Sequence, residues 1–337
     1  MLRISIIGLG SWGIALAGLL CDNGHEVALW GRNPERVAET RERRRNAVYL
    51  PDYELNKRVL LTDRIQEAAE RAEIIVISVA SAGVREISRD LASLIDNNAV
   101  VVSAAKGIDP DTLQTMTAII GEEIPGITTA ALSGPSHAEE VAAGLPTTCV
   151  AASRDAETAE LVQDTFMSEC FRVYTSVDLL GVELGGALKN VIALAAGISD
   201  GMAFGDNAKA ALMTRGIAEI ARLGSAMGAD TLTFSGLSGI GDLFVTCESM
   251  HSRNRRAGIL LGKGKTLDEA LAEVRMVVEG VSTAKAAHAL AERYNVDMPI
   301  TNEIYKTLFA GKNPSDAVAD LMGRDKKTER NWGLNIL

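Results

Sequence analysis

Aromatic residues and cysteines are scarce in this chain. Its 337 residues include three Trp, five Tyr, six Phe and four Cys. The core is therefore expected to consist mainly of Ala, Val, Ile and Leu. The cysteines form no C-x-x-C pair, and the four histidines add no metal-ligand spacing. We predict no metal site and no disulfide framework, which favours a reducing, cytoplasmic compartment.

Positive charge and proline are also in short supply. The net charge of −10 disfavours a nucleic-acid binder that works by general charge attraction. Eight prolines beside 31 glycines argue against a disordered or fibrous chain. Residues 4–21 are uncharged and resemble a signal peptide or a membrane span, but regularly spaced glycines interrupt them and no small-residue cleavage site follows. We therefore predict no membrane span.

Short apolar runs alternate with helical patterns in the first half of the chain. The predicted strands are residues 4–8, 27–30, 74–79, 100–104, 128–132, 147–152 and 171–175, and the first predicted helices are residues 11–22 and 34–45. Continuous apolar runs of strand length are typical of parallel strands that are buried on both faces. The alternation predicts an α/β fold with a parallel, doubly wound sheet and right-handed crossovers.

After residue 176 the strand-like runs stop. Long segments rich in Ala, Leu and Gly follow, and they predict helices at residues 179–199, 208–227, 266–275, 282–294 and 302–310. We therefore expect two domains: residues 1–178 with the doubly wound sheet, and an all-α substrate or catalytic domain at residues 179–337.

A glycine motif lies at the first strand–helix turn. Gly8, Gly10 and Gly13 fit G-x-G-x-x-G in the first β–α–β unit, which is the context that dinucleotide binding requires. Gly8 permits the tight turn, Gly10 lets the backbone approach a pyrophosphate, and Gly13 lets the helix pack on the strand. The helix N-terminus favours phosphate groups. The motif indicates a Rossmann-like domain, although a glycine-rich turn without a ligand is the alternative.

The choice of cofactor depends on the end of the second strand. An NAD-specific site places Asp or Glu there to bind the ribose 2′-hydroxyl. Here the sequence is Leu-Trp-Gly-Arg-Asn at residues 29–33, with no acid. Because Arg32 is suited to a 2′-phosphate, we favour NADP(H), with NAD(H) possible. The alternative is that Arg32 stacks on adenine or faces solvent.

Lys189 is the only charged residue between residues 184 and 199. A helix that is apolar nearly all round is buried, and buried lysines are rare unless they are paired or have a role. Burial lowers the pKa of an amine, so this lysine is suited to exchange a proton near neutral pH. Asp200 lies three turns further along the helix, too far for direct pairing. The alternative is that Lys189 extends to the surface.

Two polar segments follow this helix. Asp242 lies in a glycine-rich turn, where it is able to orient a lysine ammonium or accept a hydrogen bond from a hydroxyl. Ser252 is a suitable helix N-cap, which places Arg253 and Asn254 at a helix start. A guanidinium, an amide and free helix N–H groups suit a phosphate or a carboxylate. The alternative is a capped helix with a surface Arg and a turn Asp.

Two further polar segments follow predicted strands. Lys106 comes directly after the run at residues 100–105, and Ser-Gly-Pro-Ser-His at residues 133–137 follows another strand. In open α/β sheets, ligands bind at the carboxyl ends of the strands. His137 is the weaker candidate for a general acid, because it precedes a helical run and suits a cap or a packing position.

The ordered motifs of the chain are similar to those of one enzyme family. They are GxGxWG at 8–13, AKG at 105–107, SGPS at 133–136, ELGGALKN at 183–190, GIGDL at 239–243, TCxSxxSRN at 246–254 and VEG at 278–280. The chain resembles NAD(P)-dependent glycerol-3-phosphate dehydrogenases of the bacterial type over almost its whole length. Each motif is weak alone, but the ordered set is specific.

The resemblance implies roles for individual residues. The implied catalytic residues are Lys189, Asp242, Lys106, Asn190 and Thr246. The implied cofactor-binding residues are Gly8, Gly10, Ser11, Trp12, Gly13, Arg32, Lys106, Ala138, Arg253, Val277 and Glu279. The implied substrate-binding residues are Lys106, Gly134, Ser136, Lys189, Asp242, Ser252, Arg253 and Asn254.

The resemblance also implies a reaction. It is the interconversion of dihydroxyacetone phosphate and sn-glycerol 3-phosphate by hydride transfer with NAD(P)H, with Lys189 as proton donor and acceptor, to supply phospholipid synthesis. The apolar helical domain favours a homodimer. Two alternatives stay open: another dehydrogenase with a Rossmann domain and a helical domain, of the 6-phosphogluconate or 2-hydroxyacid type, and a non-catalytic redox sensor that binds a dinucleotide.

Overall fold

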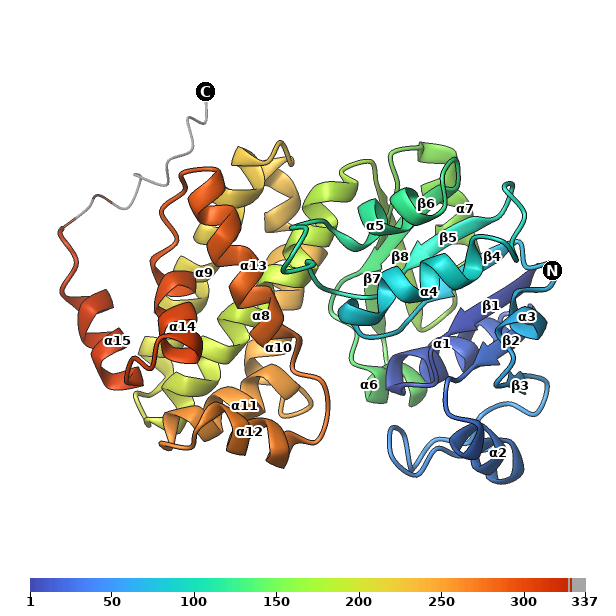
Figure 1. Cartoon of the computed structure of the whole chain (residues 1–337), viewed down its shortest axis with the longest axis horizontal. Helices are drawn as coiled ribbons and strands as arrows, with labels where there is room; N and C mark the ends of the chain where they lie inside the picture. Colours follow the sequence, from blue (N-terminus) through green and yellow to red (C-terminus); the bar gives the residue numbers. More distant parts are fainter. Residues whose placement is uncertain (327, 329–337) are drawn as a thin grey trace. The chain divides into compact units, whose positions relative to one another are not determined.

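The chain forms two compact units in a computed structural model that describes residues 1–326 and 328 (Figure 1). The first unit consists of Met1–Lys106 and Met116–Leu179, and the second of Gly107–Thr115 and Leu180–Leu337. The last part of the predicted helical domain, residues 327 and 329–337, lies outside the described residues. The first unit contains a sheet flanked by helices, and the regular elements described in the second unit are helices.

The sheet of the first unit has eight strands in the order β3-β2-β1-β4-β5-β6-β7-β8. The strands are β1 (Arg3–Ile7), β2 (Glu26–Trp30), β3 (Leu60–Thr62), β4 (Ile74–Ile77), β5 (Val100–Ser103), β6 (Thr128–Ser133), β7 (Thr147–Ala152) and β8 (Phe171–Ser176). The helices are α1 (Ser11–Asp22), α2 (Pro34–Arg43), α3 (Ile65–Ala69), α4 (Val84–Leu91), α5 (Met116–Glu123), α6 (Ala138–Ala142) and α7 (Ala156–Phe166). The short 3₁₀ turn Ser81–Gly83 precedes α4. The predicted Rossmann-like sheet is confirmed.

The central strands of this sheet are buried on both faces. Side chains of β4 and β5 contribute to two separate apolar clusters, one with α1, α6 and α7 and the other with α3, α4 and α5. Every residue of β4 and β5 is buried, which explains why these strands are continuous apolar runs in the sequence. The carboxyl ends of the parallel strands are therefore held on a rigid base.

The prediction of a wholly parallel sheet is wrong at one step. β7 pairs antiparallel with β6, and Ser133 lies opposite Val150. The connection contains only the five-residue helix α6, and it returns the chain beside the end of the strand that it has just left. A short connection of this kind joins antiparallel strands, whereas a parallel crossover spans the length of the sheet. β8 is parallel to β7, so these two strands run against the other six.

The second unit is a bundle of helices around one long apolar helix. Its α-helices are α8 (Leu179–Gly201), α9 (Asp206–Ala226), α10 (Asp242–Glu248), α11 (Arg253–Gly262), α12 (Leu267–Val274), α13 (Glu279–Arg293), α14 (Pro299–Phe309) and α15 (Pro314–Met322). By length and composition, α8 is the one helix in the described part of the chain that is able to cross a membrane. It is almost wholly buried, and its side chains form the centre of the apolar core.

Glycines allow α8 and α11 to contact each other through their backbones. A Cβ atom at Gly197 would lie 2.1 Å from the carbonyl oxygen of Arg255, and one at Gly258 would lie 2.2 Å from that of Leu194. Only glycine permits so close an approach. The contact brings the start of α11 close to the middle of α8, where Lys189 lies.

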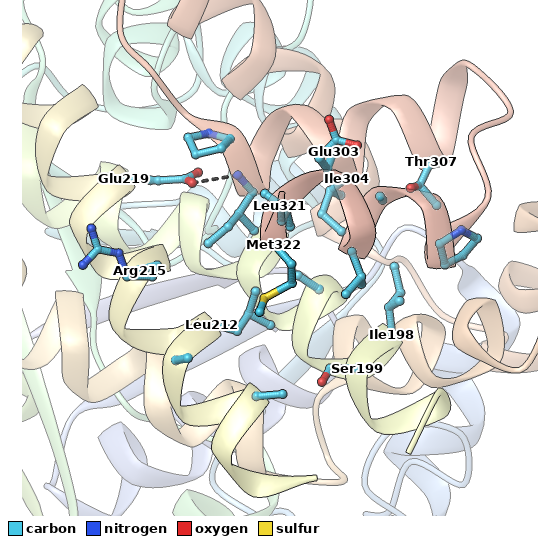
Figure 2. A pocket seen from close by; sticks show the side chains of 18 of the residues that line it. Ile198, Ser199, Leu212, Arg215, Glu219, Glu303, Ile304, Thr307, Leu321 and Met322 are labelled. Carbon is cyan, nitrogen blue, oxygen red and sulfur yellow. Dashed lines mark hydrogen bonds between the residues drawn. The ribbon is translucent and has the colours of Figure 1, made fainter. Parts of the chain in front are cut away.

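An apolar cavity of about 520 Å³ lies among α8, α9, α14 and α15 (Figure 2). Leu212, Ile304 and Met322 are among the side chains that line it, and Glu219 of α9 adds a carboxylate. None of the residues implied as catalytic lines this cavity. It is therefore separate from the polar cluster around Lys189.

Candidate active site

The glycine motif joins β1 to α1 in the first unit. Gly8 has a φ of +135°, a conformation that residues with a side chain rarely adopt. A Cβ atom at Gly13 would lie 1.9 Å from the carbonyl oxygen of Gly8, so helix and strand are in direct backbone contact. Gly10 is the N-cap of α1, and apart from its two chain neighbours no described residue lies within 4 Å of where its Cβ would be. The three positions thus provide a turn, a close packing contact and an open approach to the helix N-terminus.

Polar atoms near this turn fit a bound dinucleotide. The side-chain Nε1 of Trp12 and the hydroxyls of Ser78 and Ser133 are buried without a hydrogen-bond partner among the described residues. Ser78 directly follows β4 and Ser133 is the last residue of β6, so both lie at the carboxyl edge of the sheet. Trp12 lies in the first turn of α1. Buried polar groups nearly always have partners, so their presence here fits a polar ligand. Ser11 donates a hydrogen bond to the carbonyl of Tyr49 at 3.2 Å.

Arg32 follows β2 at the same edge of the sheet. It is exposed, and its Nη2 lies 3.1 Å from Oε2 of Glu86, in the first turns of α4. The next residue, Asn33, caps α2 by accepting a hydrogen bond from the backbone N–H of Arg36. Glu86 could not be predicted as a partner of Arg32 from the sequence, because no short-range pattern links it to β2. The role of Arg32 toward a 2′-phosphate stays a prediction.

Lys106, Gly134 and Ser136 come together beyond the ends of β5 and β6. The Lys106 ammonium donates to the carbonyl of Gly134 at 2.9 Å, and the Ser136 hydroxyl donates to the same oxygen at 3.0 Å. Gly134 has a φ of +140° and packs directly on the backbone of β7. Ala138 begins α6 and is buried in the apolar cluster with α1. Beyond β5 and β6, this edge of the sheet therefore presents the Lys106 ammonium and the Ser136 hydroxyl.

Lys189 lies at the centre of a buried polar cluster in the second unit. Its ammonium donates to Oδ1 of Asp242 and, at 2.7 Å, to Oγ1 of Thr246. The lysine and aspartate side chains are 7% and 1% exposed. The alternative in which Lys189 extends to the surface is therefore excluded. Thr246 uses its own proton to donate to the backbone carbonyl of Asp242 at 2.6 Å, which fixes the direction of its lone pairs.

Local structure brings Asp242 and Thr246 onto the same side of α10. Asp242 is the first residue of this helix, directly after the π-helical turn Leu237–Gly241, and Thr246 follows one turn later. Residues four apart on a helix are neighbours on one face. The neighbouring Cys247 is inert, because burial raises the pKa of its thiol to about 12 even though the Lys189 charge opposes this rise.

Asn190 and Asn254 connect the helices around this cluster. The Asn254 amide donates to Oδ1 of Asn190 at 2.9 Å and accepts from the backbone N–H of Gly280 at 2.8 Å. Both asparagines are buried, so this bridge holds α8, α11 and the start of α13 together. Val277 is exposed and Glu279 is half-buried, just before and at the start of α13.

Ser252 and Arg253 lie at the N-terminus of α11. The Ser252 side chain caps the helix by accepting from the backbone N–H of Arg255 at 3.2 Å, as predicted from its position. Arg253 is the first residue of this ten-residue helix and is exposed. A helix N-terminus with an exposed guanidinium is able to bind an anion.

Asp200, near the end of α8, pairs with residues of other helices and not with Lys189. It accepts from Arg255 Nε at 2.7 Å and from Lys209 Nζ at 3.1 Å. Arg255 also donates to the carbonyl of Glu248, before the loop that leads into α11. The aspartate thereby ties the end of α8 to this loop. These contacts could not be predicted from the sequence, because Arg255 and Lys209 belong to other helices.

The described residues contain neither a group of metal ligands nor a disulfide. Within residues 1–326 and 328, no group of three or more His, Cys, Asp and Glu side chains is arranged to hold a metal ion. All four cysteines are free thiols, and three of them are buried.

A glycine turn for a dinucleotide in one unit and a buried lysine–carboxylate pair in a helical unit define a class: NAD(P)-dependent dehydrogenases with a Rossmann domain and a helical domain. Residues 3–159 match the family model described as NAD-dependent glycerol-3-phosphate dehydrogenase N-terminus, and residues 178–319 match the corresponding C-terminus model. The chain belongs to this family of glycerol-3-phosphate dehydrogenases.

Full-length relatives carry the same name. The chain is 53% identical over 337 residues to glycerol-3-phosphate dehydrogenase [NAD(P)+] of Fusobacterium nucleatum, covering 98% of this chain and 100% of the relative. It is 55% identical over 328 residues to the enzyme of that name from a Thermoanaerobacter species, covering 97% and 99%. The crystal structure of glycerol-3-phosphate dehydrogenase from Coxiella burnetii superposes with a TM-score of 0.93 at 36% identity, covering 96% of this chain and 99% of that one.

Proposed function

We propose that this chain catalyses the interconversion of dihydroxyacetone phosphate and sn-glycerol 3-phosphate with NAD(P)H. The observation that carries the proposal is the buried Lys189–Asp242–Thr246 cluster in a chain whose relatives bear this activity in their names over its full length. A buried ammonium in an apolar helix is costly unless it is paired, and it is suited to proton transfer.

The proposed chemistry divides between the cofactor and the protein. When bound, the nicotinamide supplies or accepts a hydride. As dihydroxyacetone phosphate is reduced, negative charge develops on its C2 oxygen, and the Lys189 ammonium stabilises that oxygen and donates the proton. Asp242 and Thr246 each accept a hydrogen bond from the ammonium and thereby fix the direction of two of its N–H bonds. Oxidation of glycerol 3-phosphate needs neutral Lys189, so this direction is favoured at higher pH.

The phosphate of the substrate is assigned to the start of α11. The backbone N–H groups of that helix, the Arg253 guanidinium and the Asn254 amide provide charge-assisted hydrogen-bond donors for a dianion. Binding energy from the phosphate then orients the reacting carbon. Lys106, with Gly134 and Ser136, is assigned to the substrate, and Asn190 to the proton-transfer network.

The dinucleotide is assigned to the glycine turn and its neighbours. Gly10 leaves space for the pyrophosphate, and the unpartnered Trp12 and Ser78 groups fit a polar ligand. NADP(H) is favoured because Arg32 follows β2 where NAD-specific sites have an acid, and NAD(H) is also accepted. Ser11, Ala138, Arg253, Val277 and Glu279 are assigned to the cofactor by family resemblance.

The proposal extends to the metabolic role of the product, to the location of the protein and to its oligomeric state. The proposed product, glycerol 3-phosphate, supplies phospholipid synthesis, and the four free thiols support a cytoplasmic location. A homodimer formed through the helical unit is proposed because apolar side chains are exposed there, among them Phe204 at 43% and Met322 at 82%. Sedimentation velocity distinguishes a dimer from a monomer.

A substrate panel tests the proposed activity. The purified protein is mixed with NADPH, and the absorbance of the reduced nicotinamide is followed after addition of dihydroxyacetone phosphate. Rapid loss of absorbance is expected, with little loss when unphosphorylated dihydroxyacetone is added instead. The oxidative panel uses NADP+ with 6-phosphogluconate or 2-hydroxy acids, and turnover with these alone favours the related dehydrogenases. Tight cofactor binding without turnover of any substrate favours the redox sensor.

A further inference from the structure

The charged pair Arg32–Glu86 lies where a Rossmann domain distinguishes NADP from NAD. Arg32 comes directly after β2, and Glu86 belongs to the first turns of α4. Their side chains are 3.1 Å apart and are 60% and 63% exposed. A ligand therefore has access to both groups. No carboxylate comes from the end of β2 itself, so α4 supplies the acid that the sequence pattern lacks.

The two charges favour different cofactors. A guanidinium binds a 2′-phosphate through charge-assisted hydrogen bonds, whereas a carboxylate accepts from a ribose hydroxyl and repels a phosphate. The nearby Arg36 is engaged elsewhere, because it donates to the Tyr49 hydroxyl at 2.9 Å and lies over the Tyr49 ring. Glu86 is thus the acid that the structure pairs with Arg32.

We propose that Glu86 is a specificity-determining residue, which lowers the preference for NADPH over NADH by holding Arg32 and by repelling the 2′-phosphate. This inference rests on the proposed function, in which Arg32 binds that phosphate. When NADPH binds, the Arg32 guanidinium has to leave Glu86 or to contact Glu86 and the 2′-phosphate at the same time. NADH binding leaves the pair in place. Exposed pairs of charges interact weakly in water, so the expected change in relative affinity is about three- to tenfold.

The test measures dissociation constants of NADPH and NADH by fluorescence titration for the wild type and for Glu86→Gln. Gln keeps the size of the side chain and removes its charge. The Kd for NADPH is expected to fall about three- to tenfold, with the Kd for NADH unchanged or up to about twofold higher. In the Arg32→Ala background the gain from Glu86→Gln is expected to be smaller, because the competition for Arg32 is gone.

The matched control is Glu70→Gln. Glu70 is an exposed residue that pairs with the half-buried Arg3 at 3.9 Å in the same unit, so its loss is expected to leave the ratio of the two dissociation constants unchanged. The proposal is overturned if Glu86→Gln changes both dissociation constants by the same factor or changes neither. Because the readout is binding, failure of this inference is separate from failure of the proposed reaction, which the dihydroxyacetone phosphate assay reports.

Discussion

Lys189 combines deep burial with two fixed hydrogen-bond acceptors. Both Asp242 and Thr246 come from α10, so one short helix sets the direction of the ammonium group. Removing one partner of a buried ion pair is far more damaging than removing an exposed charge, because the remaining charge has neither water nor a partner. The chemistry of the proposed reaction therefore depends on a group whose orientation the fold itself maintains.

The glycine motif allows folding and cofactor binding to be separated by two substitutions. Gly13→Ala places a methyl group where only 1.9 Å is available to the carbonyl oxygen of Gly8, and a large fall in Tm is expected. The new Cβ in Gly10→Ala lies more than 4 Å from every described residue except its chain neighbours, so Tm is expected to stay within a few degrees of the wild type. Its Kd for NADPH is expected to rise about tenfold or more, because the new methyl group obstructs the approach of the pyrophosphate.

Thermal unfolding and fluorescence titration of the two variants check this prediction. A Gly10→Ala protein that binds NADPH as tightly as the wild type would contradict the assignment of the pyrophosphate to this turn. A Gly13→Ala protein of unchanged Tm would show that α1 and β1 are not in the contact described.

At the scale of elements, α14 depends on a carboxylate from α9. Glu219 accepts from the backbone N–H groups of Ile300 and Thr301, at 2.7 and 3.1 Å, in the first turn of α14 (Figure 2). Burial raises the pKa of Glu219 to about 7, although these donors oppose the rise. The ordinary pKa of this carboxyl is 4.5, so the folded state binds the proton more tightly than the unfolded state does.

The free energy of unfolding of the second unit is therefore expected to depend on the protonation of Glu219. The protonated group contributes stability that is fully present below about pH 4.5 and is lost as the pH rises through about 7. Urea unfolding at pH 5 and pH 8 is compared for the wild type and Glu219→Gln, which cannot titrate. Relative to this variant, the wild type is expected to lose about 2–3 kcal/mol between the two pH values.

The exposed variant Glu160→Gln serves as the control for this experiment. Its free energy of unfolding is expected to follow that of the wild type at both pH values. Parallel pH profiles for wild type and Glu219→Gln would contradict the buried, proton-binding carboxyl.

A second element-scale prediction concerns the loop before α11. Asp200 holds Arg255, which in turn donates to the carbonyl of Glu248. Asp200→Asn weakens this connection and allows the start of α11, with Arg253, to move. The KM for dihydroxyacetone phosphate is expected to rise about tenfold, with kcat within about threefold of the wild type, because a misplaced phosphate site mainly weakens binding.

Steady-state kinetics with varied substrate check this split between KM and kcat. Asp297→Asn is the matched control, since Asp297 pairs with Arg324 at 2.7 Å among residues that line the apolar cavity. An unchanged KM in Asp200→Asn, or an equal rise in the control, would contradict the positioning role.

At the scale of the whole molecule, local patterns predicted most elements and few of the long-range contacts. The bounds of α1 and β7 follow directly from the sequence, because a continuous apolar run and a glycine turn act over a few residues. The edge strand β3 was missed, since three residues carry no periodicity. The predicted direction of β7 was wrong, because the direction depends on the path of the connection between β6 and β7 and not on the residues of the strand.

In the candidate site, too, features with a local sequence signal were predictable and contacts between distant residues were not. The burial of Lys189 was predictable from the apolar residues around it, and Asp242 was recognised as a possible partner from its glycine-rich turn. The pairs Arg32–Glu86 and Asp200–Arg255 were not predicted, because the partners are distant in the sequence and belong to different elements. Charge pairs on separate elements leave no periodic signal, so only the folded structure reveals them.

In the proposed reaction, Lys189 supplies the proton for reduction of dihydroxyacetone phosphate. The most direct measurement is kcat for this substrate with saturating NADPH in Lys189→Met, beside Lys209→Met as a matched control. Lys209 is a buried lysine of the same unit, paired with Asp200 and Glu248. We expect kcat to fall about 10³-fold in Lys189→Met with the Kd for NADPH unchanged, and by less than about tenfold in Lys209→Met. A folded Lys189→Met protein that keeps near-normal kcat would contradict the claim.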